Sequence, residues 1–323
     1  MKINQFKDRL NQYASQAVPF IFVIDFEMQK PVIFKLDEAA NQAVFFEVNG
    51  YGNLESEKPN LSAKVFDIES VDKKKYNKAF DLVQYHIKQG DTYLLNLTCS
   101  TPIETDKKLI DIFRLAKSPY KLLFRDEFIS FSPETFIKIQ GNDIFSYPMK
   151  GTIDANVPNA AKIILSDKKE LFEHYTIVDL IRNDLSIVAK QVKVNRFRYI
   201  DKIKTNHKEL LQISSEIKGK LPENWKENLG DIMLKLLPAG SVSGAPKQKT
   251  LEIIRKAERQ NRGYYTGVFG IFDGENLDSA VLIRYIEKKE EKLIFRSGGG
   301  ITALSNSAME YQELNHKIYV PIS

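Results

Sequence analysis

The stretch YKLLFRDEFISFSPETFIKIQGNDIFSYP, residues 120–148, contains four strand-like runs in succession with no helical pattern between them. Several of these runs alternate apolar and polar residues, which is typical of half-buried strands. The tripeptide Gly141-Asn142-Asp143 before the last run predicts a hairpin turn. This stretch therefore predicts an antiparallel meander with strands at 120–124, 128–132, 135–140 and 143–148.

The rest of the chain continues this organisation, since strand-like runs occur in groups with helix-like runs between the groups. This order favours an α+β fold with antiparallel sheets over a doubly wound parallel sheet. No linker or internal repeat interrupts the sequence, so we expect a single large interwoven domain over residues 1–323. Further strands are expected at 19–26, 44–48, 92–98, 193–199, 210–217, 267–272, 277–287 and 292–297, and helices at 71–89, 107–116, 168–189, 229–237, 245–258 and 308–318.

The composition is that of a globular protein, with 43% of the 323 residues hydrophobic and 28% charged. The one cysteine, Cys99, excludes an intramolecular disulfide and fits a reducing compartment. No apolar run approaches the roughly 18 residues of a membrane span, and residues 18–24 read as a strand rather than a signal peptide. The net charge of +5 is scattered among acidic residues and forms no nucleic-acid motif. We expect a cytoplasmic, soluble protein that binds neither nucleic acid nor membrane.

The pentapeptide Pro148-Met149-Lys150-Gly151-Thr152 contains the first candidate catalytic residue. A lysine amine attacks carbon once it has lost its proton, and burial or a neighbouring charge can lower a lysine pKa enough for this at neutral pH. The alternative is a solvated surface lysine, which is the ordinary state of this residue type. The pentapeptide alone leaves both interpretations open.

Two Glu-x-x-Glu pairs, Glu170 with Glu173 and Glu310 with Glu313, lie in helix-like runs. Residues three apart share a helix face, so each pair places two carboxylates side by side. Mg²⁺ offsets their repulsion and binds one or two carboxylates together with water and ligand oxygens. A solvated helix face explains either pair alone, and the two pairs indicate a metal site only if both face the same place.

The triplet Gly298-Gly299-Gly300 follows a predicted strand. Its backbone amides can approach an anion closely and form a nest for a carboxylate or phosphate, and a flexible turn or a bulge is the alternative. The segment from Gly240 to Lys247 is no phosphate-binding loop, because that pattern requires other residues at positions 245 and 246.

Taken in this order, these segments resemble the chorismate-utilising enzymes, a family that includes anthranilate, aminodeoxychorismate, isochorismate and salicylate synthases. Residues 173–184, EHYTIVDLIRND, are similar to the family's Glu-His-x-x-x-Val-Asp-Leu-x-Arg-Asn-Asp segment. Residues 237–247 resemble its Gly-Ser-x-Thr-Gly-Ala-Pro-Lys loop, residues 262–267 its Arg-Gly-x-Tyr-x-Gly turn, and residues 298–301 with 310–313 its C-terminal signature. The resemblance covers residues 80–315, and residues 1–70 form a short divergent N-terminal part.

The resemblance implies two antiparallel sheets packed as a sandwich with helices outside, and it implies a reaction. Within the family, Pro-x-Lys-Gly-Thr marks the aminodeoxychorismate synthases, and a Ser-Pro-Glu segment supplies their general acid. Lys150 would then attack C2 of chorismate while Glu134 protonates the leaving C4 hydroxyl. Ammonia would add at C4 and expel Lys150, giving 4-amino-4-deoxychorismate without release of pyruvate. No Cys-His-Glu triad fits around Cys99, so the ammonia is expected from a glutamine amidotransferase partner or from solution.

The resemblance also implies how the chorismate dianion is bound. One carboxylate would bind Mg²⁺, and the other would pair with Arg284, whose planar fork matches a carboxylate. The expected metal ligands are Glu173 and Glu313, with Glu170 and Glu310 alongside them. The other expected substrate contacts are Tyr265, Gly299 and Gly300 at the enolpyruvyl carboxylate, Gly151, Thr152 and His207 at the ring end, and Gly298 as a further substrate-binding residue.

Two departures from the family pattern bear on the reaction. Leu94 stands where members that add water carry a lysine base and where ammonia users usually carry glutamine, which argues against isochorismate or salicylate synthesis. The N-terminal part lacks the Leu-Leu-Glu-Ser segment that binds tryptophan in larger members, so no tryptophan feedback is expected. Two alternatives stay open: anthranilate synthase component I, a lyase that releases pyruvate, and an inactive member that serves only as a partner subunit.

Overall fold

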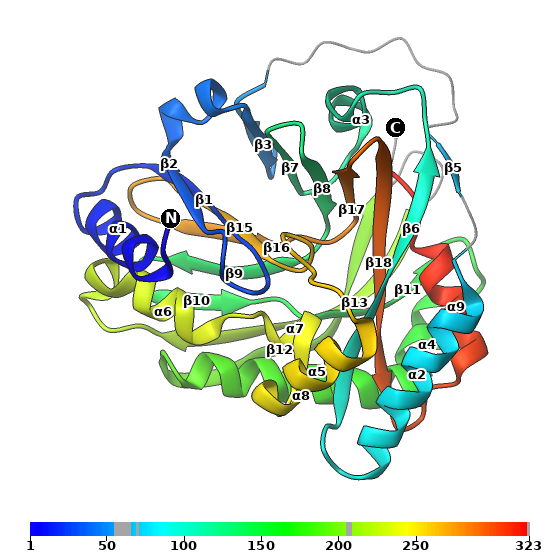
Figure 1. Ribbon diagram of the computed structural model, residues 1–323. Helices are drawn as coiled ribbons and strands as arrows, with labels where there is room; N and C mark the ends of the chain where they lie inside the picture. Colours follow the sequence, from blue (N-terminus) through cyan, green and yellow to red (C-terminus); the bar gives the residue numbers. More distant parts are fainter. Residues whose placement is uncertain (55–65, 69–70, 205–208, 322–323) are drawn as a thin grey trace.

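The computed structural model describes residues 1–54, 66–68, 71–204 and 209–321 (Figure 1). Within these ranges the chain forms two antiparallel sheets that pack on each other, and helices cover their outer faces. The predicted α+β sandwich in a single domain is confirmed. No helix in this part of the chain is long and apolar enough to cross a membrane.

The first sheet contains the strand that carries Lys150 and both strands of the β9–β10 hairpin. In spatial order its strands are β11 (Met149–Asp154), β13 (Glu209–Lys220), β10 (Asp143–Ser146), β9 (Thr135–Gln140), β16 (Leu277–Val281), β15 (Val268–Phe272), β1 (Phe20–Ile24) and β2 (Val32–Lys35), with β12 (Lys190–Lys204) beside β13.

The second sheet contains the glycine triplet. In spatial order its strands are β14 (Gly244–Ala245), β6 (Leu94–Glu104), β18 (Lys292–Thr302), β17 (Tyr285–Lys289), β8 (Phe128–Ser132), β7 (Tyr120–Phe124), β3 (Val44–Val48) and β4 (Tyr51–Gly52), with β5 (Asp67–Ile68) beside β6.

The helices lie outside this pair of sheets. They are α1 (Ile3–Ser15), α2 (Lys73–Lys88), α3 (Leu109–Leu115), α4 (Ala160–Ser166), α5 (Lys168–Ser186), α6 (Leu229–Leu236), α7 (Gly240–Ser243), α8 (Lys247–Glu258) and α9 (Ser307–His316), with short 3-10 turns at Leu36–Glu38, Ala40–Gln42 and Trp225–Asn228.

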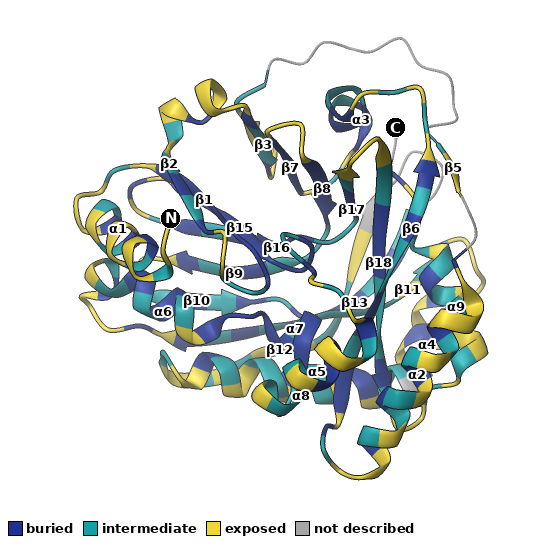
Figure 2. Ribbon diagram, viewed as in Figure 1, coloured by how far each residue is buried: buried dark blue, intermediate teal, exposed yellow. Residues whose placement is uncertain are grey.

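Much of the strand ribbon is coloured as buried (Figure 2). Among the described residues the buried apolar side chains form three clusters, and β1 contributes to two of them. Phe20, Phe22 and Ile24 pack beneath helices, whereas Ile21 and Val23 point between the sheets. This is the period of two that a strand buried on both faces requires. All five side chains are fully buried, and each contributes about 1.5–3 kcal/mol relative to exposure.

The sequence patterns missed β2, β11, α4 and helix α1, which is the largest of these elements. In α1 the fully buried residues Phe6, Leu10 and Ala14 recur every four positions. The other positions are mostly polar, so the apolar face of α1 is narrow. α1 packs tightly on α6, because a Cβ on Gly230 would lie 2.3 Å from the carbonyl oxygen of Lys7.

The strand expected at 277–287 is two strands in different sheets. β16 ends at Val281 in the first sheet, and β17 begins at Tyr285 in the second. Between them the Leu282 N–H donates to the carbonyl oxygen of Gly267, and Arg284 adopts a left-handed φ of 51°. The chain thus changes sheets at residues 282–284, which places Arg284 at the junction between the sheets.

Candidate functional site

A cavity of about 190 Å³ opens where the chain changes sheets. Glu134 lies where the chain passes from β8 of the second sheet to β9 of the first, and Arg284 lies where it passes from β16 of the first to β17 of the second. Lys150 on β11 and the glycine triplet on β18 line the same cavity from the two sheets. The site is therefore built at the junction of the sandwich rather than on one sheet.

The structure gathers most of the expected site residues around this cavity. Gly151, Thr152, Glu170, Glu310 and Glu313 do not line it, and Thr152 is exposed. His207 lies outside the described residues. The expected residues that line the cavity are Lys150, Glu134, Glu173, Tyr265, Arg284, Gly298, Gly299 and Gly300.

Lys150 forms a close ion pair, with Nζ 2.6 Å from Oε2 of Glu173. Burial lowers the pKa of Lys150, but the charge and hydrogen bond of Glu173, with the charges of Glu170 and Glu313, outweigh burial and raise it. The lowered pKa that a nucleophilic lysine needs is therefore not present in this arrangement of side chains. The lysine is held as an ammonium, and it can attack carbon only after it leaves Glu173 and loses a proton.

Glu134 accepts a hydrogen bond from the Ser241 hydroxyl on α7. Burial raises the pKa of the Glu134 carboxyl, while this hydrogen bond and the charges of Lys317 and Lys150 oppose the rise. A carboxyl group with a raised pKa retains its proton closer to neutral pH, which suits a general acid. Ser241 was not among the expected site residues, although its loop was singled out in the sequence.

Glu170 and Glu310, the first member of each pair, lie in the first turn of a helix that has a side-chain cap. Asp167 accepts from the Glu170 N–H at the start of α5, and Asn306 accepts from the N–H groups of Ala308 and Met309 at the start of α9. The positive end of a helix dipole favours carboxylates nearby. His174 holds α5 on β13 through a 2.6 Å hydrogen bond between its Nε2 and Ser215 Oγ.

The two glutamate pairs face one region, as a shared metal site requires. Burial raises the pKa of Glu170. The positive charge of Lys150 lowers this pKa, and the negative charges of Glu173 and Glu313 raise it further. Gly151 makes room for one carboxylate, because a Cβ there would lie 3.2 Å from Glu170 Oε2, whereas a Cβ on Gly299 would lie at an ordinary contact distance of 3.8 Å from Glu310 Oε2. Gly151 also has a left-handed φ of 74°, so a side chain there would be strained.

The donor set fits Mg²⁺ in its chemistry. Glu170 Oε2 is buried and has no hydrogen-bond partner among the described residues, which leaves an oxygen available to a cation. Within the described ranges no three His, Cys, Asp or Glu side chains are already gathered as a metal cage. Mg²⁺ does not require such a cage, since it usually binds one or two carboxylates and completes its shell with water and substrate oxygens.

The glycine triplet is not a nest after its strand, and it lies inside β18. Gly298, Gly299 and Gly300 pair in register with Thr98, Leu97 and Asn96 of β6. None of the three has a positive φ, so their amides do not converge on an anion. Their contribution is space, because a Cβ on Gly300 would come within 3.3 Å of the Leu94 side chain at the cavity wall.

The cavity also contains cationic side chains that the sequence patterns missed. Lys317 Nζ pairs with Glu313 at 2.8 Å and donates to the carbonyl oxygen of Gly298 at 3.1 Å. Arg296 is 3% exposed and also lines the cavity. Both residues flank recognised motifs, and an arginine in an alternating strand reads as a solvent-facing residue from sequence alone.

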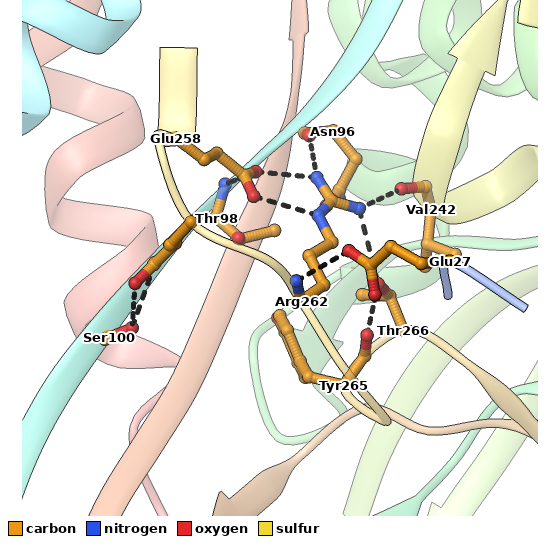
Figure 3. Close-up of polar contacts among 10 residues, drawn as sticks. Glu27, Asn96, Thr98, Ser100, Val242, Glu258, Arg262, Tyr265 and Thr266 are labelled. Atoms are coloured by element: carbon orange, nitrogen blue, oxygen red, sulfur yellow. Dashed lines mark hydrogen bonds and ion pairs between the residues drawn. The ribbon is translucent and has the colours of Figure 1, made fainter. Parts of the chain in front are cut away.

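A buried hub fixes the walls of the cavity (Figure 3). Arg262 Nε and Nη2 bind the two oxygens of Glu258 at 3.0 and 2.7 Å. Its remaining hydrogens reach the carbonyl oxygens of Val242 and Asn96 and the hydroxyl of Thr266, at 2.7, 2.6 and 3.3 Å. These last three residues line the cavity, so one arginine sets the spacing of α7, β6 and the segment before β15.

Comparison with known proteins gives concordant matches. The family model described as chorismate binding enzyme matches residues 13–323. An uncharacterized PabA-like protein of Pasteurella multocida is 52% identical over 326 residues, covering 100% of both chains. Anthranilate synthase component 1 of Thermococcus kodakarensis is 34% identical over 245 residues, 72% of this chain and 56% of the other. The crystal structure of a putative 2,3-dihydroxybenzoate-specific isochorismate synthase of Bacillus anthracis has a TM-score of 0.73 at 23% identity, covering 98% of this chain and 87% of that one.

Proposed function

Since this chain belongs to the family of chorismate binding enzymes, we propose that it converts chorismate and ammonia into 4-amino-4-deoxychorismate, as component I of an aminodeoxychorismate synthase. The observation that carries this proposal is a lysine, Lys150, in the wall of a cavity that also contains a carboxyl group with a raised pKa, Glu134. A nucleophile and an acid in one cavity suit displacement of a hydroxyl group from a ring.

In the proposed reaction the neutral amine of Lys150 forms a bond to C2 of chorismate. Both conjugated ring double bonds shift, and the C4 oxygen leaves as water with the proton that Glu134 donates. Ammonia then forms a bond to C4, both double bonds shift back, and Lys150 departs from C2. The proton released by the incoming ammonia can return to the Glu134 carboxylate, which restores both residues for another turnover.

Mg²⁺ is the proposed cofactor, and Glu173 and Glu313, with Glu170 and Glu310 nearby, would hold it. When bound, it would offset the charge of these carboxylates and of one substrate carboxylate. Lys150 shares Glu173 with this proposed site, so its ion pair has to break before its amine acts. Tyr265 and Arg284 are the groups that would face the enolpyruvyl carboxylate.

The proposed source of ammonia is a glutamine amidotransferase subunit. The chain has one cysteine, Cys99, and burial raises the pKa of its thiol to about 12. Such a thiol has almost no thiolate at neutral pH, so it cannot act as the nucleophile that releases ammonia from glutamine. The chain on its own would therefore use free ammonia.

Turnover of chorismate by the purified chain tests this function. With Mg²⁺ and an ammonium salt, we expect 4-amino-4-deoxychorismate without pyruvate, measured by liquid chromatography and by a coupled pyruvate assay. Release of pyruvate with a fluorescent anthranilate product would assign the chain to the anthranilate synthases instead. No Mg²⁺-dependent turnover with any ammonia source would leave the inactive subunit as the better interpretation.

Replacing Ser241 with alanine is expected to shift the pH profile of turnover. The Ser241 hydroxyl holds the pKa of Glu134 down, so its loss raises that pKa further. Because Glu134 acts in its protonated form, activity declines as pH rises through this pKa, and the alkaline limb of kcat should move to higher pH in the variant. An unchanged alkaline limb would mean that another group sets it.

A further inference from the structure

We propose that Arg296 binds a carboxylate in this cavity and thereby sets a requirement for a second carboxylate on the substrate. This inference rests on the proposed function, because chorismate carries one carboxylate on its ring and one on its enolpyruvyl ether. The binding group is the Nε and Nη2 edge of the Arg296 guanidinium. Arg296 lies in β18, two residues before the glycine triplet.

The two edges of this guanidinium have different surroundings. Nη1 lies 3.1 Å from Oε1 of Glu287 on β17, which fixes the orientation of the group. Nε and Nη2 share the opposite edge, and both are buried without a hydrogen-bond partner among the described residues. Buried donors of this kind are costly to leave unpaired, and two parallel N–H groups match the two oxygens of a carboxylate. A ligand carboxylate is therefore the partner that fits this edge.

The strand geometry places the free edge beside the substrate space. Side chains alternate along a strand, so Arg296, Gly298 and Gly300 face the same side of β18. The two glycines add no side chain to that side, where a Cβ on Gly298 would come within 3.1 Å of Asn96 Oδ1 and a Cβ on Gly300 within 3.3 Å of the Leu94 side chain. Tyr265 lies over the arginine, with the guanidinium carbon 5.3 Å from its ring centroid. A ligand lying over the glycines would meet Arg296 at one end.

Arg284, the arginine expected from sequence, is already engaged in part. Its Nη1 donates to the carbonyl oxygen of Lys317 at 2.8 Å, and its guanidinium carbon lies 4.5 Å from the ring centroid of Tyr319. Arg296 is the more deeply buried of the two arginines. A buried arginine held by one carboxylate and open at its other edge discriminates strongly between ligands with and without a matching anion.

The test compares a dicarboxylate with a monocarboxylate by isothermal titration calorimetry at fixed Mg²⁺. 3-(Carboxymethoxy)benzoate carries both carboxylates, and benzoate carries only the one on the ring. Arg296→Met should weaken binding of the dicarboxylate by at least about 30-fold, since truncation of a buried charged partner costs about 2 kcal/mol or more. Its affinity for benzoate should stay within about 3-fold of the wild type, because benzoate does not reach this edge.

Two further variants separate binding from support of the fold. Glu287→Gln replaces the ion pair of Arg296 with a neutral acceptor and keeps its free edge, so dicarboxylate binding should weaken far less than in either Arg296 variant. Arg296→Lys keeps a charge beside Glu287 but has no bidentate edge, and it should lose most of the dicarboxylate affinity. This variant decides the question if the methionine variant does not fold.

Three outcomes would overturn the inference. If the wild type binds the dicarboxylate and both Arg296 variants bind it as tightly, Arg296 is no carboxylate receptor, and the proposed function stands. If Glu287→Gln and the Arg296 variants all lower the affinity for the dicarboxylate and for benzoate by the same factor, the arginine only supports the fold. If the wild type binds neither ligand nor chorismate, the proposed function fails and this inference fails with it.

Discussion

Replacement of Lys150 by methionine is expected to lower the turnover of chorismate by on the order of 10³-fold or more. The variant has no amine to attack C2, and no other lysine replaces it on β11, which contains only this one. Methionine preserves most of the side-chain volume, so the cavity wall should keep its shape. The measurement is the initial rate with saturating chorismate, Mg²⁺ and ammonium.

Arginine at position 150 is the matched control for charge. A guanidinium keeps the positive charge beside Glu173, but it is not a nucleophile at neutral pH. If Lys150 forms the covalent bond, Lys150→Arg and Lys150→Met should lose turnover alike. If the lysine only balances the glutamates, the arginine variant should retain most of the rate, and this result would contradict the proposed covalent role.

Mass spectrometry gives the same question an answer that does not depend on rates. Wild-type protein is mixed with chorismate and Mg²⁺ in the absence of ammonia and then quenched. It should carry a chorismate-derived adduct on the peptide that contains Lys150. The same peptide from Lys150→Arg should carry none. An adduct on a different residue would move the nucleophile elsewhere and leave the family assignment intact.

The meander at 120–148 shows what local sequence patterns can and cannot predict. The predicted strands at 120–124, 128–132 and 135–140 coincide with β7, β8 and β9, because alternation of apolar residues is a local property. The change of sheet between β8 and β9 is not local, since it depends on which distant strands pair with each. Glu134 lies at that change, so its place in the cavity could not be derived from the pattern.

Arg284 and Arg296 illustrate the same limit at the other wall. Residues 277–287 read as one strand because every position in it is compatible with a strand, and only the pairing partners divide it at residues 282–284. Motifs and resemblance identified Arg284, but nothing local marks Arg296 as buried. Arg296 is buried because Tyr265 and Glu287 pack against it. Tyr265 is distant in sequence, and Glu287 lies on another strand.

Lys150 shows that residue identity does not predict charge state. The pentapeptide left open both a solvated lysine and a buried lysine with a lowered pKa, and the structure buries the side chain in part, with 25% of it exposed. It also brings Glu173 from α5 to within 2.6 Å, and that contact reverses the direction of the shift. The four glutamates were visible in the sequence as possible metal ligands, but their action on the lysine depends on the distance between α5 and β11.

The second large effect is expected at Arg262, where Arg262→Met should lower the free energy of unfolding by about 3–5 kcal/mol. The substitution leaves the charge of Glu258 buried, with the side chains of Arg262 and Glu258 only 1% and 0% exposed. It also removes hydrogen bonds to the carbonyl oxygens of Val242 and Asn96. Urea unfolding monitored by circular dichroism measures the midpoint of the transition. The slope of the transition shows whether unfolding remains cooperative.

Arg182 on α5 is the matched surface control. Its Nη2 lies 2.7 Å from Oδ1 of Asp179, the same distance that separates Arg262 Nη2 from Glu258 Oε1, but the two side chains are 47% and 61% exposed. An exposed pair of this kind contributes about 0–1 kcal/mol, so Arg182→Met should leave the midpoint nearly unchanged. Equal shifts in the two variants would contradict the assignment of Arg262 as a structural hub.

A double variant separates the buried charge from the hydrogen bonds that depend on it. Arg262→Met with Glu258→Leu removes both charges, and replacing a whole buried ion pair by apolar residues is often near neutral. Here the recovery should be only partial, because the carbonyl oxygens of Val242 and Asn96 and the N–H of Thr98 all lose a partner. Since Val242 and Asn96 line the cavity, the stability that remains missing in the double variant should be accompanied by weaker binding of chorismate. Full recovery of both would mean that the hub matters only as an ion pair.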